Sequence, residues 1–310
     1  MTPNRGPSRT SRLLDFWFEA VDPVRLDTFR VLFSIVLLLY LGVRLMHPYE
    51  WLTSYGFHYT AETRLGIDPV PWPLLPAYLV PPFVALLVGS IVCLIAGWRV
   101  RLCLWVVLAL VVYIQYVDWL TISTPNKLFI LGYAVLALAP PLRSQGPDGA
   151  LRQSAWPVRV LQATLLIQYF TAGTCKIVFG DWFLHTDVLW SQVQGVHRTD
   201  TAAFLLRTLP KQAWSLMMYS ALLFEILAPL LFAMRRTRWL AFVWGFSFHV
   251  LVGATMGKII YFGLQMTSFY VLFMEPAQLR IAWRWLTDGA RAARNALLPG
   301  HRGVAEDPTP

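Results

Sequence analysis

Long apolar runs separated by short polar segments extend from residue 31 to residue 274. Most of them are somewhat shorter than the ~20 residues that a helix needs to cross the hydrocarbon core of a bilayer. Arginine and lysine side chains at their ends can reach the interface, so we expect the helices to continue past each run. The pattern predicts eight membrane-spanning helices, at Val31–Val43, Tyr78–Trp98, Leu102–Val117, Leu128–Leu142, Val160–Cys175, Ala213–Met234, Trp239–Gly257 and Ile259–Met274.

Composition supports an all-α, polytopic integral membrane helix bundle. Of the 310 residues, 56% are hydrophobic and 14% are charged, whereas soluble domains carry about 25% charged residues. The three cysteines lie in apolar surroundings without paired spacing, which excludes a disulfide-rich secreted scaffold. The net charge of +9 does not indicate nucleic-acid binding, because most basic residues fall in short loops between apolar runs. The lipid bilayer is therefore the expected partner.

Basic residues are divided unequally between the two sides of the predicted bundle. If the N-terminus is placed inside, 17 of the 26 lysine and arginine residues fall in the inner segments. By the positive-inside rule both termini are cytoplasmic, and we expect a multi-pass protein of the plasma (cell inner) membrane. The N-terminal residues lack the short apolar core of a signal peptide, so we expect the first span to be retained.

Three regions follow from this pattern. Residues 1–25 form a cytoplasmic, arginine-rich segment, residues 26–275 the transmembrane domain, and residues 276–310 a cytoplasmic tail. The tail mixes tryptophan and leucine with arginine, which predicts an amphipathic helix on the anionic inner leaflet followed by a disordered end. Two predicted outer loops, at about 46–77 and 177–212, are long. Long loops on one face often carry a site, so we expect chemistry to open to the outside.

Lys176 is the first ionisable residue at membrane depth. Tyr169, Gly173 and Lys176 are spaced i, i+4, i+7 and share one helix face. Gly173 would let a neighbouring helix or a flat ligand approach that face. The alternative is an interfacial lysine whose amine extends to the outer surface.

The choice of basic residues favours a special role for lysine. The chain has 22 arginines but four lysines, and all four lie on or near the predicted outer side. Arginine stays charged, whereas a desolvated or crowded lysine can lose its proton. If Lys127, Lys176 and Lys258 converge, each makes the others easier to deprotonate, which produces a neutral amine base. Codon bias is an alternative source of the arginine excess.

Glu225 and His249 form a second polar pair within the apolar runs. Each lies ten or eleven residues from the inner turn at Arg235–Arg238, which places both about 15–16 Å from the inner surface. Equal depth on antiparallel neighbours predicts a hydrogen bond or ion pair between them, either as part of a site or as a clamp between helices. The acidic residues and histidines of the outer loops lack metal-ligand spacing, so no metal site is predicted.

Several segments in fixed order resemble the horizontally transferred transmembrane (HTTM) domain, the membrane part of vitamin K-dependent γ-carboxylase. The resemblance covers about residues 22–274. The segments that carry it are Asp22–Phe33, Asn126–Gly132, Tyr169–Lys176 with Asp181-Trp182, Phe248-His249, Met256-Gly257 and Phe262–Met266.

The resemblance implies a site and a reaction. In the carboxylase a lysine, as a free amine, deprotonates vitamin K hydroquinone; oxygenation then yields a strong base that removes a γ-proton from a peptide glutamate, and CO2 adds. Lys176 falls on that lysine and is the expected general base. Lys127 and His249 would line the pocket, and Glu225 would orient His249. The residues expected to contact a reduced, vitamin K hydroquinone-like quinone are Tyr169, Gly173 and Met256.

The chain also departs from the carboxylase pattern. Cys175-Lys176 stands where the carboxylase has two lysines, and Lys127 where it has a supporting histidine. The carboxylase carries a large luminal domain after its membrane part, whereas this sequence ends about 35 residues after the last predicted span. Two other functions therefore stay open: a non-catalytic factor for maturation or export of a partner protein on the outer face, and a transporter or channel.

Overall fold

The computed structural model describes residues 9–58, 72–117, 123–144 and 151–297. The chain divides into two compact units, Met1–Phe273 and Met274–Pro310. The second unit contains one helix, α13 (Pro276–Leu297), which falls in the predicted amphipathic tail. All other elements belong to the first unit.

The first unit is helical, and each predicted apolar run coincides with helical structure. Its α-helices are α1 (Arg9–Phe18), α2 (Val24–Gly42), α3 (Pro48–Leu52), α4 (Val80–Ala96), α5 (Val100–Val117), α6 (Thr124–Leu138), α7 (Trp156–Val178), α8 (Val188–Gln192), α9 (Asp200–Thr208), α10 (Lys211–Ala233), α11 (Arg238–Met256) and α12 (Ile260–Ser268). Short 3-10 helices are η1 (Arg44–Met46), η3 (Ala77–Leu79), η5 (Gly257–Ile259) and η6 (Phe269–Phe273). The expectation of an all-α membrane bundle is confirmed.

Among the described residues, four helical stretches are long and apolar enough to cross a membrane. They are Ala77–Ala96, Val100–Val117, Lys211–Ala233 and Arg238–Phe273. Helix α6 is equally apolar in character but shorter. The protein is therefore an integral membrane protein, while the number of eight spans stays a prediction.

Local sequence sets several of these helix ends. Proline stands in the first turn of α4, α6 and α7, where its missing N–H has no intrahelical partner to lose. Helix α4 ends at Gly97, whose φ of 77° is the left-handed conformation that glycine adopts without steric cost. A short connection through Arg99 then leads directly into α5.

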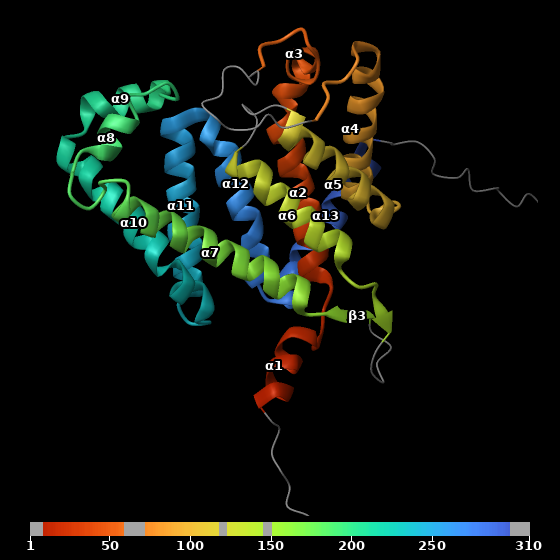
Figure 1. Cartoon of the computed structure of the whole chain (residues 1–310). Coiled ribbons are helices and arrows are strands. Elements are labelled where there is room, and N and C mark those ends of the chain that lie inside the picture. The colour runs from red at the N-terminus through yellow and green to blue at the C-terminus, as the bar shows by residue number, and fades with distance from the viewer. Residues whose placement is uncertain (1–8, 59–71, 118–122, 145–150, 298–310) are drawn as a thin grey trace, which may run out of the picture. The chain divides into compact units, whose positions relative to one another are not determined.

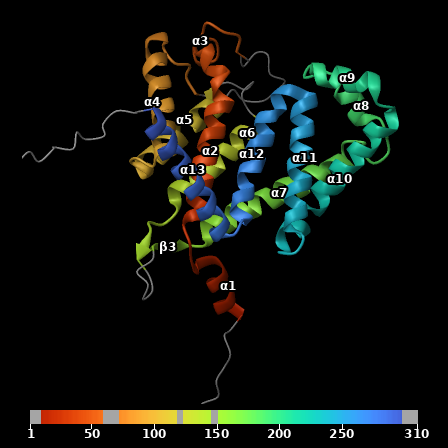
Figure 2. The same ribbon diagram turned by 180° about the vertical axis from the view of Figure 1, so that it is seen from behind.

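Within the first unit, basic turns lie at one end of the helices and long loops lie at the other end. Figure 1 shows α1 and β3 at one end, and α3, α8 and α9 at the other. Both views show α7 running obliquely across the bundle from β3 toward α8, beside α10 (Figures 1 and 2). Helix α12 lies next to α2 and α11 in both views. The C-terminal ends of α2, α7 and α11 and the N-terminal end of α12 thus lie at the end of the first unit that carries α3, α8 and α9.

A small antiparallel sheet, which the sequence pattern did not predict, fixes the start of α7. Strand β3 (Leu151–Ser154) lies between β1 (Ala20–Val21) and β2 (Arg143–Ser144). The Ala155 N–H donates to the Glu19 carbonyl over 2.9 Å, and the Arg159 guanidinium binds the Glu19 carboxylate at 3.0 Å. The N-terminal segment thereby anchors the helix that carries Lys176.

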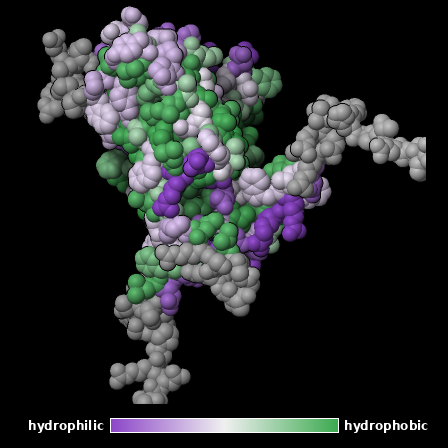
Figure 3. All heavy atoms as spheres, turned by 90° about the vertical axis from the view of Figure 1, so that its right-hand side faces the viewer, coloured by the Kyte–Doolittle hydropathy of each residue, from purple (hydrophilic) through white to green (hydrophobic). Residues whose placement is uncertain are grey.

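The exposed surface agrees with a lipid environment. Leu86 and Val92 of α4, at 51% and 50% exposed, and Trp105 of α5, at 48%, are large apolar side chains without cover. Figure 3 shows apolar side chains gathered on the face that includes α4. Such a surface would be unfavourable in water, whereas lipid tails solvate it well.

Candidate functional site

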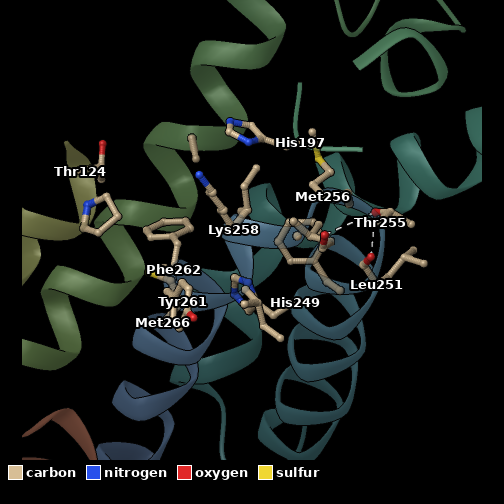
Figure 4. Close-up of a pocket in the computed structure, with 18 of the residues that line it drawn as sticks. Thr124, His197, His249, Leu251, Thr255, Met256, Lys258, Tyr261, Phe262 and Met266 are labelled. Carbon is tan, nitrogen blue, oxygen red and sulfur yellow. Dashed lines mark hydrogen bonds between the residues drawn. The ribbon is translucent and has the colours of Figure 1, made fainter. Parts of the chain in front are cut away.

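A cavity of about 1190 Å³ lies between α2, α6, α7, α10, α11 and α12 (Figure 4). Its walls are mainly aromatic, aliphatic and methionine side chains, with a few polar groups among them, which is the usual composition of a site for a small organic ligand. The ionisable side chains in its wall are Tyr40, Arg44, Lys176, His197, Glu225, His249, Lys258 and Tyr261, with Tyr169 deeper in the same wall.

Lys176 and Glu225 form an ion pair in this wall. The Lys176 ammonium donates to both oxygens of the Glu225 carboxylate, and its Nζ lies 2.5 Å from Oε2. The Glu225 side chain is 5% exposed and the Lys176 side chain 25%. Glu225 is thus a buried carboxylate whose counter-ion still faces the cavity, and the pair joins α7 to α10.

Two features of the local sequence place Lys176 there. At Gly173, one turn before Lys176, an added Cβ would lie 3.1 Å from the Cβ of Glu225 and 3.0 Å from Ile226, so glycine allows α10 to pack close. After α7, Asp181 adopts a left-handed φ of 55°. The chain turns back there, and the Trp182 ring lies 4.9 Å from the Lys176 Nζ. The Asp181-Trp182 pair therefore covers the amine on one side.

A second polar group in the wall is a hydrogen-bonded chain of three buried side chains. The Tyr169 hydroxyl lies 2.7 Å from His249 Nε2 and 2.7 Å from the Tyr270 hydroxyl. Tyr270 fits beside α11 because residue 245 is glycine: an added Cβ would lie 2.1 Å from the Tyr270 hydroxyl oxygen. The chain thus connects α7, α11 and η6.

Tyr270, at the end of these hydrogen bonds, shows which side chain donates in each of them. Within the described part of the molecule, the Tyr270 hydroxyl has Tyr169 as its hydrogen-bond partner. If Tyr169 donated to Tyr270, the Tyr270 hydrogen would be buried without an acceptor, which costs about 1–3 kcal/mol. Tyr270 therefore donates to Tyr169, and Tyr169 donates to Nε2 of His249. The neutral imidazole then carries its hydrogen on Nδ1, so the free N–H donor of His249 is at Nδ1.

Residues 18–278 match the HTTM domain. The match covers most of the chain. This protein belongs to the HTTM family. No curated protein and no solved structure matches it.

The HTTM protein brings most of the predicted site residues to one cavity. Lys176, Glu225 and His249 lie in the wall, as do Tyr169 and Met256. Gly173 lies behind the wall and contacts α10. The sequence suggested that either a neighbouring helix or a flat ligand could come close to Gly173, and the structure shows a helix there. The catalytic and cofactor-binding roles of these residues stay predictions.

Glu225 and His249 do not bind each other in the HTTM protein. Glu225 pairs with Lys176, and His249 with Tyr169. Counting residues from the inner turn gives their depth, but it does not give the direction in which each side chain leaves its helix. Glu225 faces α7 rather than α11, and for this reason the expected orientation of His249 by Glu225 is replaced by orientation through Tyr169.

The lysines do not converge as the sequence suggested. Lys176 and Lys258 line the cavity, whereas Lys127 is exposed and does not. Asn126, the neighbour of Lys127 in the first turn of α6, is the buried residue there, at 2% exposed. The fourth lysine, Lys211, lies 4.0 Å from the Trp190 ring. The group in contact with Lys176 is a carboxylate, not a second amine.

Sequence reasoning missed several polar groups of the site. Tyr270 lies in an apolar run, where a tyrosine is most simply interpreted as packing, and no spacing rule connects it to Tyr169. Arg44 and His197 also line the cavity, and no pattern in the sequence pointed to either of them. The Asp181-Trp182 pair was noted for its resemblance, and its contact with Lys176 required the structure. Among the described residues, no group of three histidine, cysteine or acidic side chains could hold a metal ion.

Proposed function

We propose that this HTTM protein is a carboxylase-like membrane enzyme that binds a reduced, lipid-soluble quinone in the cavity and uses Lys176 as its general base. The observation that carries the proposal is the Lys176–Glu225 pair, which places an amine at the wall of an apolar cavity. Ionisable groups at membrane depth are costly, and they are retained mainly where they do chemistry.

The cavity fits a ligand of this kind. Its volume of about 1190 Å³ exceeds that of a quinone ring system and leaves space for part of an isoprenoid chain. Aromatic side chains, Phe262 and Phe248 among them, give flat apolar walls. His249 and Lys176 supply separate hydrogen-bonding groups for ring oxygens, and Met256 can adapt to the shape of the ring. The reduced quinone would supply, after reaction with O2, the strong base that the carboxylase uses against a glutamate.

The side chains of the wall would handle one proton. Lys176 must be a neutral amine before it can accept a proton, and it becomes one when its own proton moves to a Glu225 oxygen. This turns an ion pair into an amine and a carboxylic acid, a change that removal of water from the site favours. Nζ can then accept a proton from a ligand hydroxyl, while the His249 Nδ1–H donates to the oxygen that bears the developing negative charge.

Reconstitution in nanodiscs with chemically reduced menaquinone tests the proposal. We expect oxygen-dependent loss of the quinol and formation of its epoxide, measured by chromatography. Lys176→Arg keeps the charge and the reach but cannot provide a free base. We expect this variant to lose at least about 100-fold in rate, the lower range of general-base contributions.

Lys211→Arg is the matched control, because Lys211 is the lysine held against Trp190 outside the cavity wall. It should keep the wild-type rate. Equal turnover by Lys176→Arg and wild type would overturn the role of Lys176. Absence of quinol turnover in folded wild-type protein, with any quinone tested, would overturn the enzymatic proposal.

The second candidate function is maturation or export of a partner protein on the outer face. The observation that favours it is the exposure of Phe179, Phe183 and Leu184 next to the site, at 82%, 65% and 76%. A photoreactive amino acid at Phe183 should crosslink to one specific protein in intact cells, and one at Leu86 on the lipid-facing side should not. Crosslinking of Phe183 to lipid alone would contradict this function.

A further inference from the structure

Three basic side chains from separate segments line the mouth of the cavity. Arg44 comes from η1, His197 from the loop before α9, and Lys258 from η5, and all three line the cavity. Figure 4 shows the Lys258 amine extending toward the His197 ring. This region lies at the end of the bundle opposite the basic inner turns (Figure 1).

The loop that carries His197 is fixed in place by hydrogen bonds. The Thr199 hydroxyl donates to the Ala254 carbonyl over 2.6 Å, and the Thr199 N–H donates to the Thr255 carbonyl over 3.4 Å. The His197 carbonyl lies beside Gly257, where an added Cβ would be 3.5 Å away. His197 is therefore held next to Lys258 by backbone contacts of its loop.

Arg44 and Lys258 lie at the same level. The rings of Tyr40 and Tyr261 are in contact, with centroids 6.2 Å apart. Arg44 comes four residues after Tyr40, in a segment that runs toward the mouth of the cavity. Lys258 comes three residues before Tyr261, in a segment that runs away from the mouth. Each cation is thus one helical turn outside the aromatic pair. Two cationic side chains and an imidazole therefore line the mouth, with Tyr40 and Tyr261 below them.

This cationic charge has no counter-charge within the described part of the chain. Glu225 is the acidic residue of the cavity wall, and Lys176 neutralises it. The Arg44 guanidinium lies 5.2 Å from the Trp51 ring, and its buried Nη1 has no hydrogen-bond partner. Lys258 and His197 make no ion pair with a described residue. A buried guanidinium N–H without an acceptor is costly, so an acceptor from beyond the described residues is expected at this position.

We propose that Arg44, His197 and Lys258 bind the phosphate of a membrane phospholipid, with an apolar chain of that lipid on the Tyr40–Tyr261 floor. A guanidinium binds two phosphate oxygens side by side, and an ammonium and an imidazole reach the others. The mouth lies where the long apolar helix Arg238–Phe273 is interrupted by η5, and the cavity wall below it is mainly apolar, which suits an anion with a hydrocarbon chain. The site stands on these contacts and does not depend on quinone chemistry.

Competition between lipids in nanodiscs tests the site. The purified protein is placed in mixed phosphatidylglycerol and phosphatidylcholine, and the lipids retained after transfer to detergent are measured by native mass spectrometry. Wild type should retain phosphatidylglycerol in preference. Arg44→Gln and Lys258→Gln should each reduce this preference by about fivefold, the effect of one basic residue at an anionic lipid surface. The double variant should show none.

Lys211→Gln, which removes an outer lysine that does not line the cavity, is the control and should keep the preference. Because Lys258 is exposed, Lys258→Gln is expected to fold even if Arg44→Gln does not. Unchanged lipid preference in folded Lys258→Gln would overturn the proposal. If inorganic phosphate alone stabilises the protein, the mouth binds a soluble anion. If oleate alone stabilises the protein, the mouth binds a carboxylate amphiphile. Either result overturns the phospholipid assignment. Quinol turnover, measured separately, is not a readout of this site.

Discussion

Lys176 and Glu225, 49 residues apart in the chain, bind each other at the wall of the cavity. The carboxylate is almost completely buried, and the amine is partly open to the cavity. Two consequences follow from this ion pair. Lys176 holds α7 against α10, and its amine is in contact with a proton acceptor.

Glu225→Gln should destabilise the protein. Removal of one partner from a fully buried ion pair costs about 3–5 kcal/mol; because the Lys176 side chain is 25% exposed, water screens part of this loss, and we expect about 1–3 kcal/mol. The measurement is urea unfolding in detergent micelles. The double variant Lys176→Met/Glu225→Gln should recover much of the loss, because no unpaired charge is left. A double variant less stable than Glu225→Gln would contradict the ion pair.

Gly173→Ala should separate α7 from α10. Its Cβ would lie 3.0 Å from Ile226 and 3.1 Å from Glu225, which is closer than ordinary contacts. We expect a loss of about 1–3 kcal/mol, typical of an overpacked site, measured by thermal unfolding. Gly89→Ala in α4 is the matched control, since nothing lies within 4 Å of its added Cβ. The control should be neutral or slightly stabilising; equal destabilisation of both variants would show that close packing at Gly173 is not the cause.

Tyr169→Phe should change the tautomer of His249. With the hydroxyl chain intact, Nδ1 carries the hydrogen and Nε2 accepts from Tyr169. Without the Tyr169 hydroxyl, Nε2 loses its donor and the two neutral tautomers should mix. Nitrogen NMR of histidine-labelled protein measures this directly, with His249→Gln to assign the signal. Tyr270→Phe should keep the Nδ1–H form, because Tyr169 can still donate. A protonated Nε2 in neutral His249 of the wild type would overturn the deduced direction of the chain.

Trp182→Leu should uncover the Lys176 amine. The indole lies 4.9 Å from Nζ, and contacts of this kind contribute about 0.5–2 kcal/mol. We therefore expect Lys176 to react about threefold to tenfold faster with a lysine-acylating reagent, with the extent of modification read by mass spectrometry of peptides. Lys127, exposed and distant from Trp182 in the sequence, serves as the internal standard within the same sample. No change in Lys176 relative to Lys127 would show that Trp182 does not shield the amine.

Single cysteines at positions 196 and 236 should report the orientation. Val196 is 96% exposed beside the mouth, and Arg236 lies in the turn between α10 and α11. In a background without the native cysteines, a membrane-impermeant maleimide added to intact cells should label position 196. Position 236 should react only after the cells are opened, as the positive-inside rule requires. The reverse pattern would place the cavity mouth on the cytoplasmic side.

The sequence was most informative about the helices. The apolar runs locate every long helix of the bundle, because lipid accepts only segments that satisfy their backbone hydrogen bonds internally and present apolar side chains. It was less informative about the short sheet β1–β3–β2, since strands of two to four residues leave no periodic pattern. Several segments in fixed order between Asp22 and Met266 together indicated the family, and the family match over residues 18–278 confirmed it.

The sequence by itself determined that this protein is a helical membrane protein of the HTTM family, and it located its unusual polar residues along the chain. Only the tertiary structure decided that Glu225 binds Lys176, that Tyr270 binds Tyr169, and that Arg44 and Lys258 line one cavity. The physical reason is that lipid and protein core are both apolar. A membrane helix therefore carries little amphipathic pattern to show which face is inside, and the direction of each polar side chain emerges only when the helices pack.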